Sequence, residues 1–431
     1  MPFARRALCV LIILVMLLGC QRELIPTPNL YLDPELAPFA HVPPELATNT
    51  VDLLYVTDRL RRDVANVSYG YNRSLSTAFG SIVVQIGDEV SWDDLVRAST
   101  TKKRKVSLGL SVESITELGR FPPTPGPLVV EDGVAMLSPD YLAEKQAVVH
   151  ELYDELRRRL SMTSRKEAYV FVHGFSNTFE VAAFRMAEMW HFLGREGVPI
   201  LYSWPAGYPG LIRGYNHDRE SGEFTIFHLK EFLRALAGCP QIDTIHLIAH
   251  SRGTDVAMTA MRELILEVRA GGDDPRTALK FGNVIMAAPD IDADVSSQRN
   301  GAERLHDGYE LLTVYVSQND RAIGSAEWLF SSPRRIGKIK PEQVLESERA
   351  RIKLITNADI IDARVHTDYT GHGYFLSNPA VFSDIILILR YDRTPGAANG
   401  RPLTPIMHNY YILDDNYPQK AAPMPKGRSA R

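Results

Sequence analysis

The stretch 244-TIHLIAHSRGTDVAM-258 decides the fold, because it joins a short apolar run to a helix-like run through a few small residues. The run "TIHLIA" has the length and aliphatic content of a buried strand, and apolar residues recur at helical spacing after Gly253. Ser251 stands at the junction, with Ala249 two residues before it and Gly253 two residues after it. A sharp turn that lifts a nucleophilic serine from a strand onto a helix needs small residues at both positions. The segment therefore predicts a strand, a turn and a helix with Ser251 as a candidate nucleophile.

Further apolar runs surround this segment and indicate the fold class. They alternate with helix-length segments near 178–194, 219–237 and 254–269. Strands that are apolar on both faces and separated by helices form a mostly parallel sheet with helices on both sides, and ligands meet such a sheet at the carboxyl ends of its strands. We therefore expect an α/β, doubly wound fold. The runs are "AYVFVHG", "VPILYSW", "FGNVIMAAP" and "LLTVYVSQND", with extra N-terminal strands expected at 50–59 and 79–87 and a helix at 141–160.

Composition narrows the class of partner. The chain has 431 residues, of which 45% are hydrophobic and 23% charged, as in a soluble globular protein with a large core. Its formal net charge of −4 provides no basic field for a phosphate backbone, so we expect no nucleic-acid partner.

The N-terminus has the pattern of a targeting signal. Arg5 and Arg6 precede the apolar stretch 7–19, which is shorter than the ~20 residues of a membrane-spanning helix. The stretch ends in Leu-Leu-Gly-Cys, which resembles the lipobox of bacterial lipoproteins, in which the cysteine, here Cys20, carries the lipid. Gln21, and not Asp, follows Cys20. The resemblance implies a lipid-anchored protein of the bacterial cell envelope, at the outer membrane and facing the periplasm.

These patterns divide the chain into five expected segments. Six prolines between residues 21 and 48 favour an extended spacer after the signal, and the last forty or so residues show little periodicity. The expected segments are a signal peptide (1–19), a Pro-rich tether (20–49), a strand-rich extension (50–135), an α/β core (136–392) and an irregular tail (393–431).

A nucleophilic serine needs amide donors for the negative charge that develops on the attacked oxygen. The stretch 169-YVFVHGFSNTF-179 has a predicted strand that ends at Gly174 and a helix that opens near Thr178. We expect the backbone N–H groups of Phe175 and Arg252 to form this oxyanion hole. The alternative is that His173 and Gly174 form an ordinary tight turn.

A serine nucleophile also needs an acid and a base, which follow it in this order along the chain in hydrolases of this topology. Asp320 follows the late strand "LLTVYVSQND" and is the preferred acid, although it is equally placed to cap a helix that starts near Ile323. Asp290, Asp292 and Asp294 follow the preceding strand and are the rival acids, with Asp290 and Asp292 the main alternatives. The preferred base is His372 in "TGHGYF", where flanking glycines allow a loop to bring the imidazole back to the sheet edge, and His366 is the alternative.

Together these pieces resemble one known family. The segment from about Val51 to Ile388 is similar to the α/β hydrolases of the DUF900 family of esterases. The similar stretches are "VDLLYVTDR", "VFVHGFSNTFEVAAFR", "LYSWPAG", "GYNHDRES", "LIAHSRG", "MAAPDIDADV", "VYVSQNDRA" and "GHGYF". The resemblance implies the hydrolase fold with Ser251, Asp320 and His372 as the catalytic triad.

The expected function is that of a membrane-tethered serine hydrolase that cleaves a small-molecule or lipid carboxylic ester through an acyl-enzyme, with no metal and no organic cofactor. Two alternatives remain open. The same triad serves acyltransferases and peptidases, and a non-catalytic envelope scaffold can keep the fold with Ser251 as a turn residue only.

Overall fold

A computed structural model of the chain describes residues 22–63, 67–323, 334–343, 346, 349, 353–368 and 370–418. The expected signal peptide and Cys20 lie outside the described residues. Within the described ranges, no helix has both the length and the apolar character needed to cross a bilayer.

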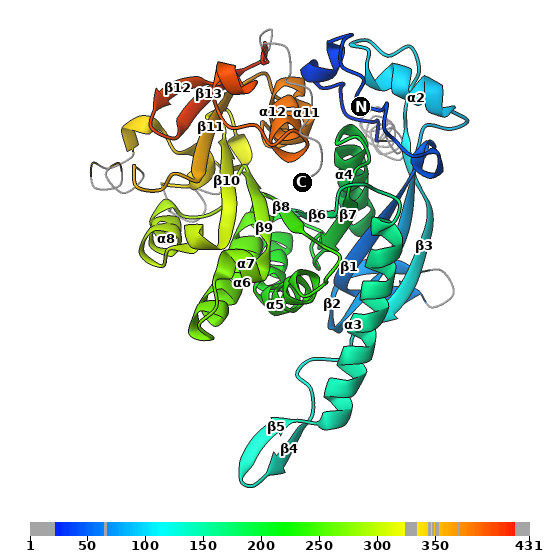
Figure 1. Cartoon of the computed structure of the whole chain (residues 1–431), viewed down its shortest axis with the longest axis vertical. Helices are drawn as coiled ribbons and strands as arrows, with labels where there is room; N and C mark the ends of the chain where they lie inside the picture. Colours follow the sequence, from blue (N-terminus) through cyan, green and yellow to red (C-terminus); the bar gives the residue numbers. More distant parts are fainter. Residues whose placement is uncertain are drawn as a thin grey trace, which may run out of the picture.

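The centre of the fold is one eleven-stranded sheet in the order β12-β13-β11-β10-β9-β8-β6-β7-β1-β2-β3 (Figure 1). The strands in the middle of the sheet, from β13 through β11, β10, β9, β8, β6 and β7 to β1, all run parallel to their neighbours. The outer pairs β1–β2, β2–β3 and β12–β13 are antiparallel. The strands are β1 (Thr50–Asp63), β2 (Ser68–Ile86), β3 (Leu110–Arg120), β6 (Glu167–Val172), β7 (Val198–Ser203), β8 (Thr244–His250), β9 (Phe281–Ala287), β10 (Tyr309–Val316), β11 (Ala358–Arg364), β12 (Thr404–Met407) and β13 (Tyr410–Asp414).

Helices cover both faces of this sheet, as the alternation of apolar strands with helices predicts. On β8, Ile245, Leu247 and Ala249 pack into one apolar cluster with α3, α5 and α6, whereas Ile248 points into a second cluster with α4 and α12. The main helices are α3 (Pro139–Leu160), α4 (Phe179–Phe192), α5 (Leu211–Ala237), α6 (Arg252–Ala270) and α12 (Pro379–Leu389), and the short ones are α2 (Trp92–Ser99), α7 (Pro275–Leu279), α8 (Ala293–Ser297) and α11 (Tyr374–Ser377).

The predicted α/β class is therefore confirmed, and each apolar run of the core is a strand of the sheet. One helix boundary differs. The helix expected from 219 begins at Leu211, so the polar residues from Asp218 to Ser221 lie inside α5 and not at its start.

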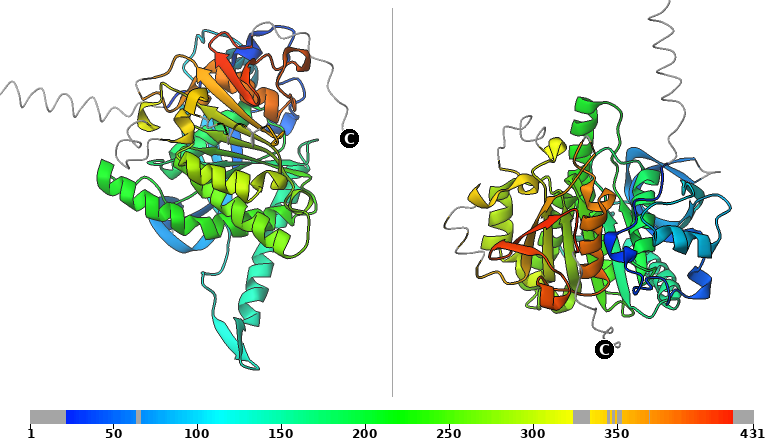
Figure 2. Two further views of the ribbon diagram at one scale, coloured as in Figure 1. Left: turned by 90° about the vertical axis from the view of Figure 1, so that its left-hand side faces the viewer. Right: turned by 90° about the horizontal axis from the view of Figure 1, so that it is seen from above.

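The N-terminal strands extend the same sheet. β1 pairs in parallel with β7, and β2 and β3 continue from it as a long antiparallel meander. A separate hairpin of β4 (Leu128–Glu131) and β5 (Val134–Leu137) stands away from the body at the far end of α3 (Figures 1 and 2).

Residues 22–49 differ from the expected extended tether. Leu30, Tyr31 and Phe39 are buried in the same cluster as α4 and α12, and two 3₁₀ turns, η1 (Asn29–Leu32) and η2 (Pro44–Leu46), interrupt the segment. The prolines set a non-helical backbone, but the apolar residues between them are large enough to bind it to the domain surface.

The C-terminal tail also differs from the expected irregular segment. β13 pairs in parallel with β11, and β12 closes that end of the sheet. Arg401, which is fully buried, forms an ion pair of 2.8 Å with Asp384 on α12. The tail up to residue 418 is thus part of the folded sheet, and local periodicity missed it because each of its strands has only four or five residues.

Candidate active site

Ser251 occupies a strained turn between β8 and α6. Its backbone has φ 53° and ψ −127°, a region that residues with a side chain rarely adopt. The turn is held by hydrogen bonds from the Ser251 N–H to the Ala287 oxygen (2.9 Å) and from the Thr254 hydroxyl to the Ser251 oxygen (2.6 Å). The predicted strand, turn and helix are therefore present, with the Ser251 backbone in the conformation that a nucleophile elbow requires.

Two glycines let neighbouring backbone approach this turn. A Cβ atom built on Gly253 would lie 2.3 Å from the His173 oxygen, and one on Gly174 would lie 2.8 Å from the Ser251 Cβ. Neither distance leaves room for a methyl group. The small residues in both sequence motifs thus serve one purpose, which is to pack the loop after β6 directly against the serine turn.

The loop after β6 presents the amide that the sequence singles out. The Gly174 oxygen accepts hydrogen bonds from His173 Nδ1 (3.0 Å) and Asn177 Nδ2 (3.2 Å). Because the peptide group is planar and trans, this fixes the Phe175 N–H in the opposite direction. In the part of the chain that the structure describes, neither the Phe175 N–H nor the Arg252 N–H at the start of α6 has an acceptor. Both amides are therefore free to bind an oxyanion.

Asp320 and His372 are joined directly. Asp320 Oδ2 lies 2.7 Å from His372 Nδ1, and the aspartate is fully buried. Its other oxygen, Oδ1, accepts the Ile323 N–H at 2.9 Å. Asp320 thus makes both of the contacts that the two interpretations require: Oδ1 caps the following turn, and Oδ2 accepts a hydrogen bond from His372 Nδ1.

The loop that carries His372 is seated on the turn that carries Asp320. Gly371 has φ 64°, and a Cβ there would lie 2.2 Å from the Asn319 oxygen. The Arg321 N–H donates to the Thr370 oxygen at 3.0 Å. Only glycine fits the required backbone and the close approach at position 371.

The histidine and the serine meet through His250, the last residue of β8. The rings of His250 and His372 have centroids 4.8 Å apart, and His250 Nε2 lies 3.2 Å from the His372 main-chain oxygen. Across the described residues, no hydrogen bond joins the Ser251 hydroxyl to His372. The structure thus brings His372 against His250, the immediate chain neighbour of Ser251.

The alternative acids and base are engaged elsewhere. Asp290 forms a buried ion pair of 2.8 Å with Arg335, and Asp292 caps α8 by accepting the N–H groups of Asp294 and Val295. The side chain of His366 is 97% exposed and pairs with Asp415.

The pKa values of the two other histidines at the site are held low. Burial lowers the pKa of His173 and of His250 well below the ordinary value, and the nearby positive charge of Arg59 lowers that of His173 further. Both rings are therefore neutral at physiological pH.

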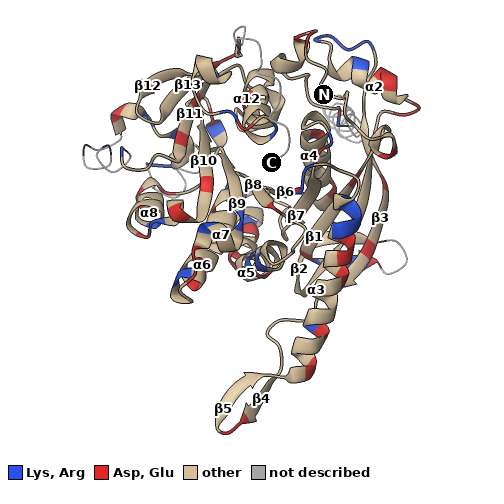
Figure 3. Ribbon diagram, in the orientation of Figure 1, with Lys and Arg blue, Asp and Glu red and all other residues tan. Residues whose placement is uncertain are grey.

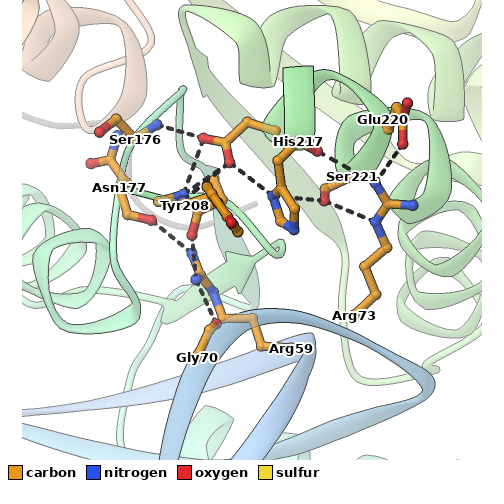
Figure 4. Close-up of polar contacts among 12 residues, drawn as sticks. Arg59, Gly70, Arg73, Ser176, Asn177, Tyr208, His217, Glu220 and Ser221 are labelled. Carbon is orange, nitrogen blue, oxygen red and sulfur yellow. Dashed lines mark hydrogen bonds and ion pairs between the residues drawn. The ribbon is translucent and has the colours of Figure 1, made fainter. Parts of the chain in front are cut away.

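Arg59 and Asp218 hold the loop after β6 in place, a role that no local sequence pattern indicates. Arg59 is 1% exposed and donates to the main-chain oxygens of Gly70, Asn177 and Ala206. It also donates to Ser203 Oγ and to His173 Nε2. Figure 4 shows Arg59 with Gly70 and Asn177. Burial lowers its pKa to about 10, still far above neutrality. A charged group ties β1, β2 and β7 to the loop.

Asp218, on α5, acts on the same loop from the other side. Its carboxylate accepts the backbone N–H groups of Ser176 (2.9 Å) and Gly207 (3.0 Å), and His217 Nδ1 lies 3.3 Å from it. Figure 4 shows Ser176, Asn177, Tyr208 and His217 gathered at this point. The conspicuous polar motif "GYNHDRES" was the available signal, but its spacing alone does not reveal which loop it contacts.

His246 is a second buried histidine of β8 with a structural environment. Its ring stacks on Tyr169 with centroids 5.0 Å apart, and Nε2 lies 3.4 Å from the Glu167 carboxylate. Burial alone would raise the pKa of Glu167, but His246, Arg165 and Tyr169 outweigh burial and lower this pKa to about 2. In the view of Figure 3, acidic and basic residues are interspersed along the described helices and strands.

Three comparisons with known proteins complete this description. A comparison with curated proteins finds no match. Among solved structures, a similar chain is the carboxylesterase CesB (YbfK) from Bacillus subtilis, with 8% identity, a TM-score of 0.26, and coverage of 56% of this chain and 96% of that chain. This likeness carries no argument about activity. The family described as "Alpha/beta hydrolase of unknown function (DUF900)" matches residues 149–390, which is more than half of the chain. The protein therefore belongs to the DUF900 family of α/β hydrolases.

Proposed function

We propose that this protein is a serine hydrolase that cleaves carboxylic esters through an acyl-enzyme on Ser251. The observation that carries the proposal is the buried 2.7 Å hydrogen bond between Asp320 and His372, beside a serine in a strained turn with two free amides next to it.

The reaction follows from the chemistry of these groups. His372 Nε2 takes the proton of the Ser251 hydroxyl as its oxygen attacks the ester carbonyl. The Phe175 and Arg252 N–H groups stabilise the negative charge on the carbonyl oxygen. His372 then gives the proton to the departing alcohol, which leaves the acyl group on Ser251. Water attacks the acyl carbonyl as His372 takes its proton, the bond to the Ser251 oxygen breaks, and His372 returns the proton to that oxygen as the acid leaves. Asp320 keeps the proton of the neutral imidazole on Nδ1, so that Nε2 is free to act as the base.

The proposal includes a lipid anchor at Cys20, supported by the sequence pattern alone. The anchor would hold the hydrolase at the bacterial outer membrane, facing the periplasm, where lipid esters and small esters are both available. Replacement of Cys20 by serine, followed by cell fractionation, tests this part separately. The proposed anchor at Cys20 would be contradicted if the variant still stayed in the membrane fraction through an acyl chain.

The experiment for the catalytic part is covalent labelling of the protein that starts after Cys20 with a fluorophosphonate probe. We expect one label, at Ser251 by peptide mass, and none in Ser251→Ala. Ser176→Ala is a matched control, because Ser176 lies on the adjacent loop and contributes its backbone N–H, and not its hydroxyl, to the contact with Asp218. Absence of Ser251-dependent labelling in folded protein would reject the serine hydrolase.

Turnover is tested with p-nitrophenyl esters of short and long acids. Product analysis in the presence of an added alcohol or amine separates hydrolysis from acyl transfer, because a transferase would form the new ester or amide in preference to the free acid. Cleavage of peptides, with no cleavage of esters, would instead favour a peptidase.

A further inference from the structure

The residue directly before the candidate nucleophile is buried at the centre of the site. His250 is 5% exposed and lies between the serine turn and the His372 loop. Its ring stacks on Phe375 of α11 with centroids 4.5 Å apart and an interplanar angle of 24°. The stacking fixes the plane of the ring, and Nε2 lies toward the loop of His372.

We propose that His250 is a positioning residue, whose Nε2–H holds the main chain of the His372 loop beside Ser251. This inference rests on the proposed function and goes beyond the triad itself.

A hydrogen bond joins the His250 ring to the main chain of His372. His250 Nε2 lies 3.2 Å from the His372 main-chain oxygen, and a carbonyl oxygen only accepts, so the proton of the neutral ring is on Nε2. His372 is then fixed at two points. Asp320 holds its side chain through Nδ1, and His250 holds its backbone.

The other ring nitrogen of His250, Nδ1, lies in a different environment. His250 Nδ1 is buried without a hydrogen-bond partner among the described residues, and it faces Gly174, where an added Cβ would lie 3.2 Å away. A buried, unpaired acceptor destabilises the folded protein, and an apolar residue at position 250 would not have this disadvantage. The hydrogen bond made by Nε2 is therefore the polar contact that distinguishes His250 from an apolar residue.

The surroundings of His250 keep its ring uncharged. Burial is the largest cause that holds the pKa of His250 well below its ordinary value, and the charges of His372 and of Arg185 on α4 lower it further. The hydrogen bond to the His372 main chain acts in the opposite direction but does not outweigh them. When His372 accepts the proton from Ser251, the adjacent His250 ring does not compete for that proton.

The test compares four variants in the hydrolysis of p-nitrophenyl butyrate. His250→Phe keeps a stacked ring but removes the donor. His250→Gln places an amide N–H near the position of Nε2, and His250→Asn is too short to do so. His246→Phe is the matched control, because it changes another buried, ring-stacked histidine of the same strand at a distance from the site.

We expect kcat to fall by about 10- to 100-fold in His250→Phe, because misplacement of a catalytic group by about 1 Å has an effect of this size. KM should change little, and the kinetic pKa seen in kcat/KM should move down because the contact of His372 with Asp320 loosens. His250→Gln should recover most of the loss, and His246→Phe should change kcat by less than about threefold.

Three outcomes would overturn the inference. The first is a His250→Phe enzyme with unchanged kcat and pH profile. The second is a kcat that falls equally in His250→Gln and His250→Phe. The third is a kcat that falls equally in His250→Gln and His250→Asn. If the Phe variant does not fold, the comparison of Gln with Asn decides. These failures differ from failure of the proposed function, in which the wild-type protein itself would show no activity that depends on Ser251.

Discussion

Gly174→Ala is the most direct test of how the loop after β6 is placed. The added Cβ would lie 2.8 Å from the Ser251 Cβ, 3.1 Å from the His250 oxygen and 3.2 Å from His250 Nδ1. Carbon atoms in contact prefer separations of about 3.5–4.0 Å, so the loop and the serine turn must move apart by about 0.7 Å or more. Gly174 has an ordinary backbone conformation, and the effect is therefore steric.

This displacement acts on the Phe175 N–H directly. Removal of one oxyanion donor lowers kcat by about 10²- to 10³-fold, and a shift of about 1 Å costs up to about 10²-fold. We therefore expect kcat for ester hydrolysis to fall by about 100-fold, equivalent to about 2.7 kcal/mol of transition-state stabilisation, with KM nearly unchanged. Overpacking should lower the free energy of unfolding by about 1–3 kcal/mol.

The assay is steady-state ester hydrolysis together with thermal unfolding by circular dichroism. Gly301→Ala is the control, because no atom lies within 4 Å of a Cβ built there. A folded Gly174→Ala enzyme with wild-type kcat would refute the placement of this loop against the serine.

Three further predictions concern residues around the site. Asp320→Asn keeps the cap on Ile323 but presents the wrong hydrogen-bonding partner to His372 Nδ1, so kcat should fall by about 10³- to 10⁴-fold, and a loss below tenfold would contradict the role of Asp320. Arg59→Met leaves three buried carbonyl oxygens without their donor, and urea unfolding should show a loss of about 3 kcal/mol or more; an unchanged midpoint would count against this network. Glu167 has a pKa of about 2 in the folded protein against an ordinary 4.5, so its stabilisation, up to about 3 kcal/mol, is present above pH 4.5 and is lost as the pH falls toward 2. The stability difference between wild type and Glu167→Gln should shrink over that interval, and a difference independent of pH would contradict the assignment.

The sequence was sufficient for the parts of the fold that local pattern controls. The strand, turn and helix around Ser251 could be predicted because small residues and apolar periodicity act over a few neighbouring positions. The pairing of Asp320 with His372 could also be anticipated, since the carboxyl ends of parallel strands meet at one edge of the sheet.

What could not be predicted depends on contacts between distant segments. Arg59 gathers acceptors from three separate stretches of the chain, and nothing in "VTDR" indicates that its guanidinium is buried. The position of Asp218 inside α5 and the packing of residues 22–49 have the same origin. Each is decided by which surfaces meet, and neighbouring sequence carries little information about that.

The packing of the N-terminal segment has a consequence for the proposed anchor. The Ile25 N–H bonds Glu188 of α4 at 3.0 Å, and the guanidinium of Arg22 reaches the same carboxylate at 3.2 Å. From Arg22 back to Cys20 is two residues, which reach about 7 Å when fully extended. If Cys20 carries the proposed lipid, a connection this short would hold the domain close to the bilayer. The enzyme would then meet its substrates with one fixed side of the domain turned to the lipid.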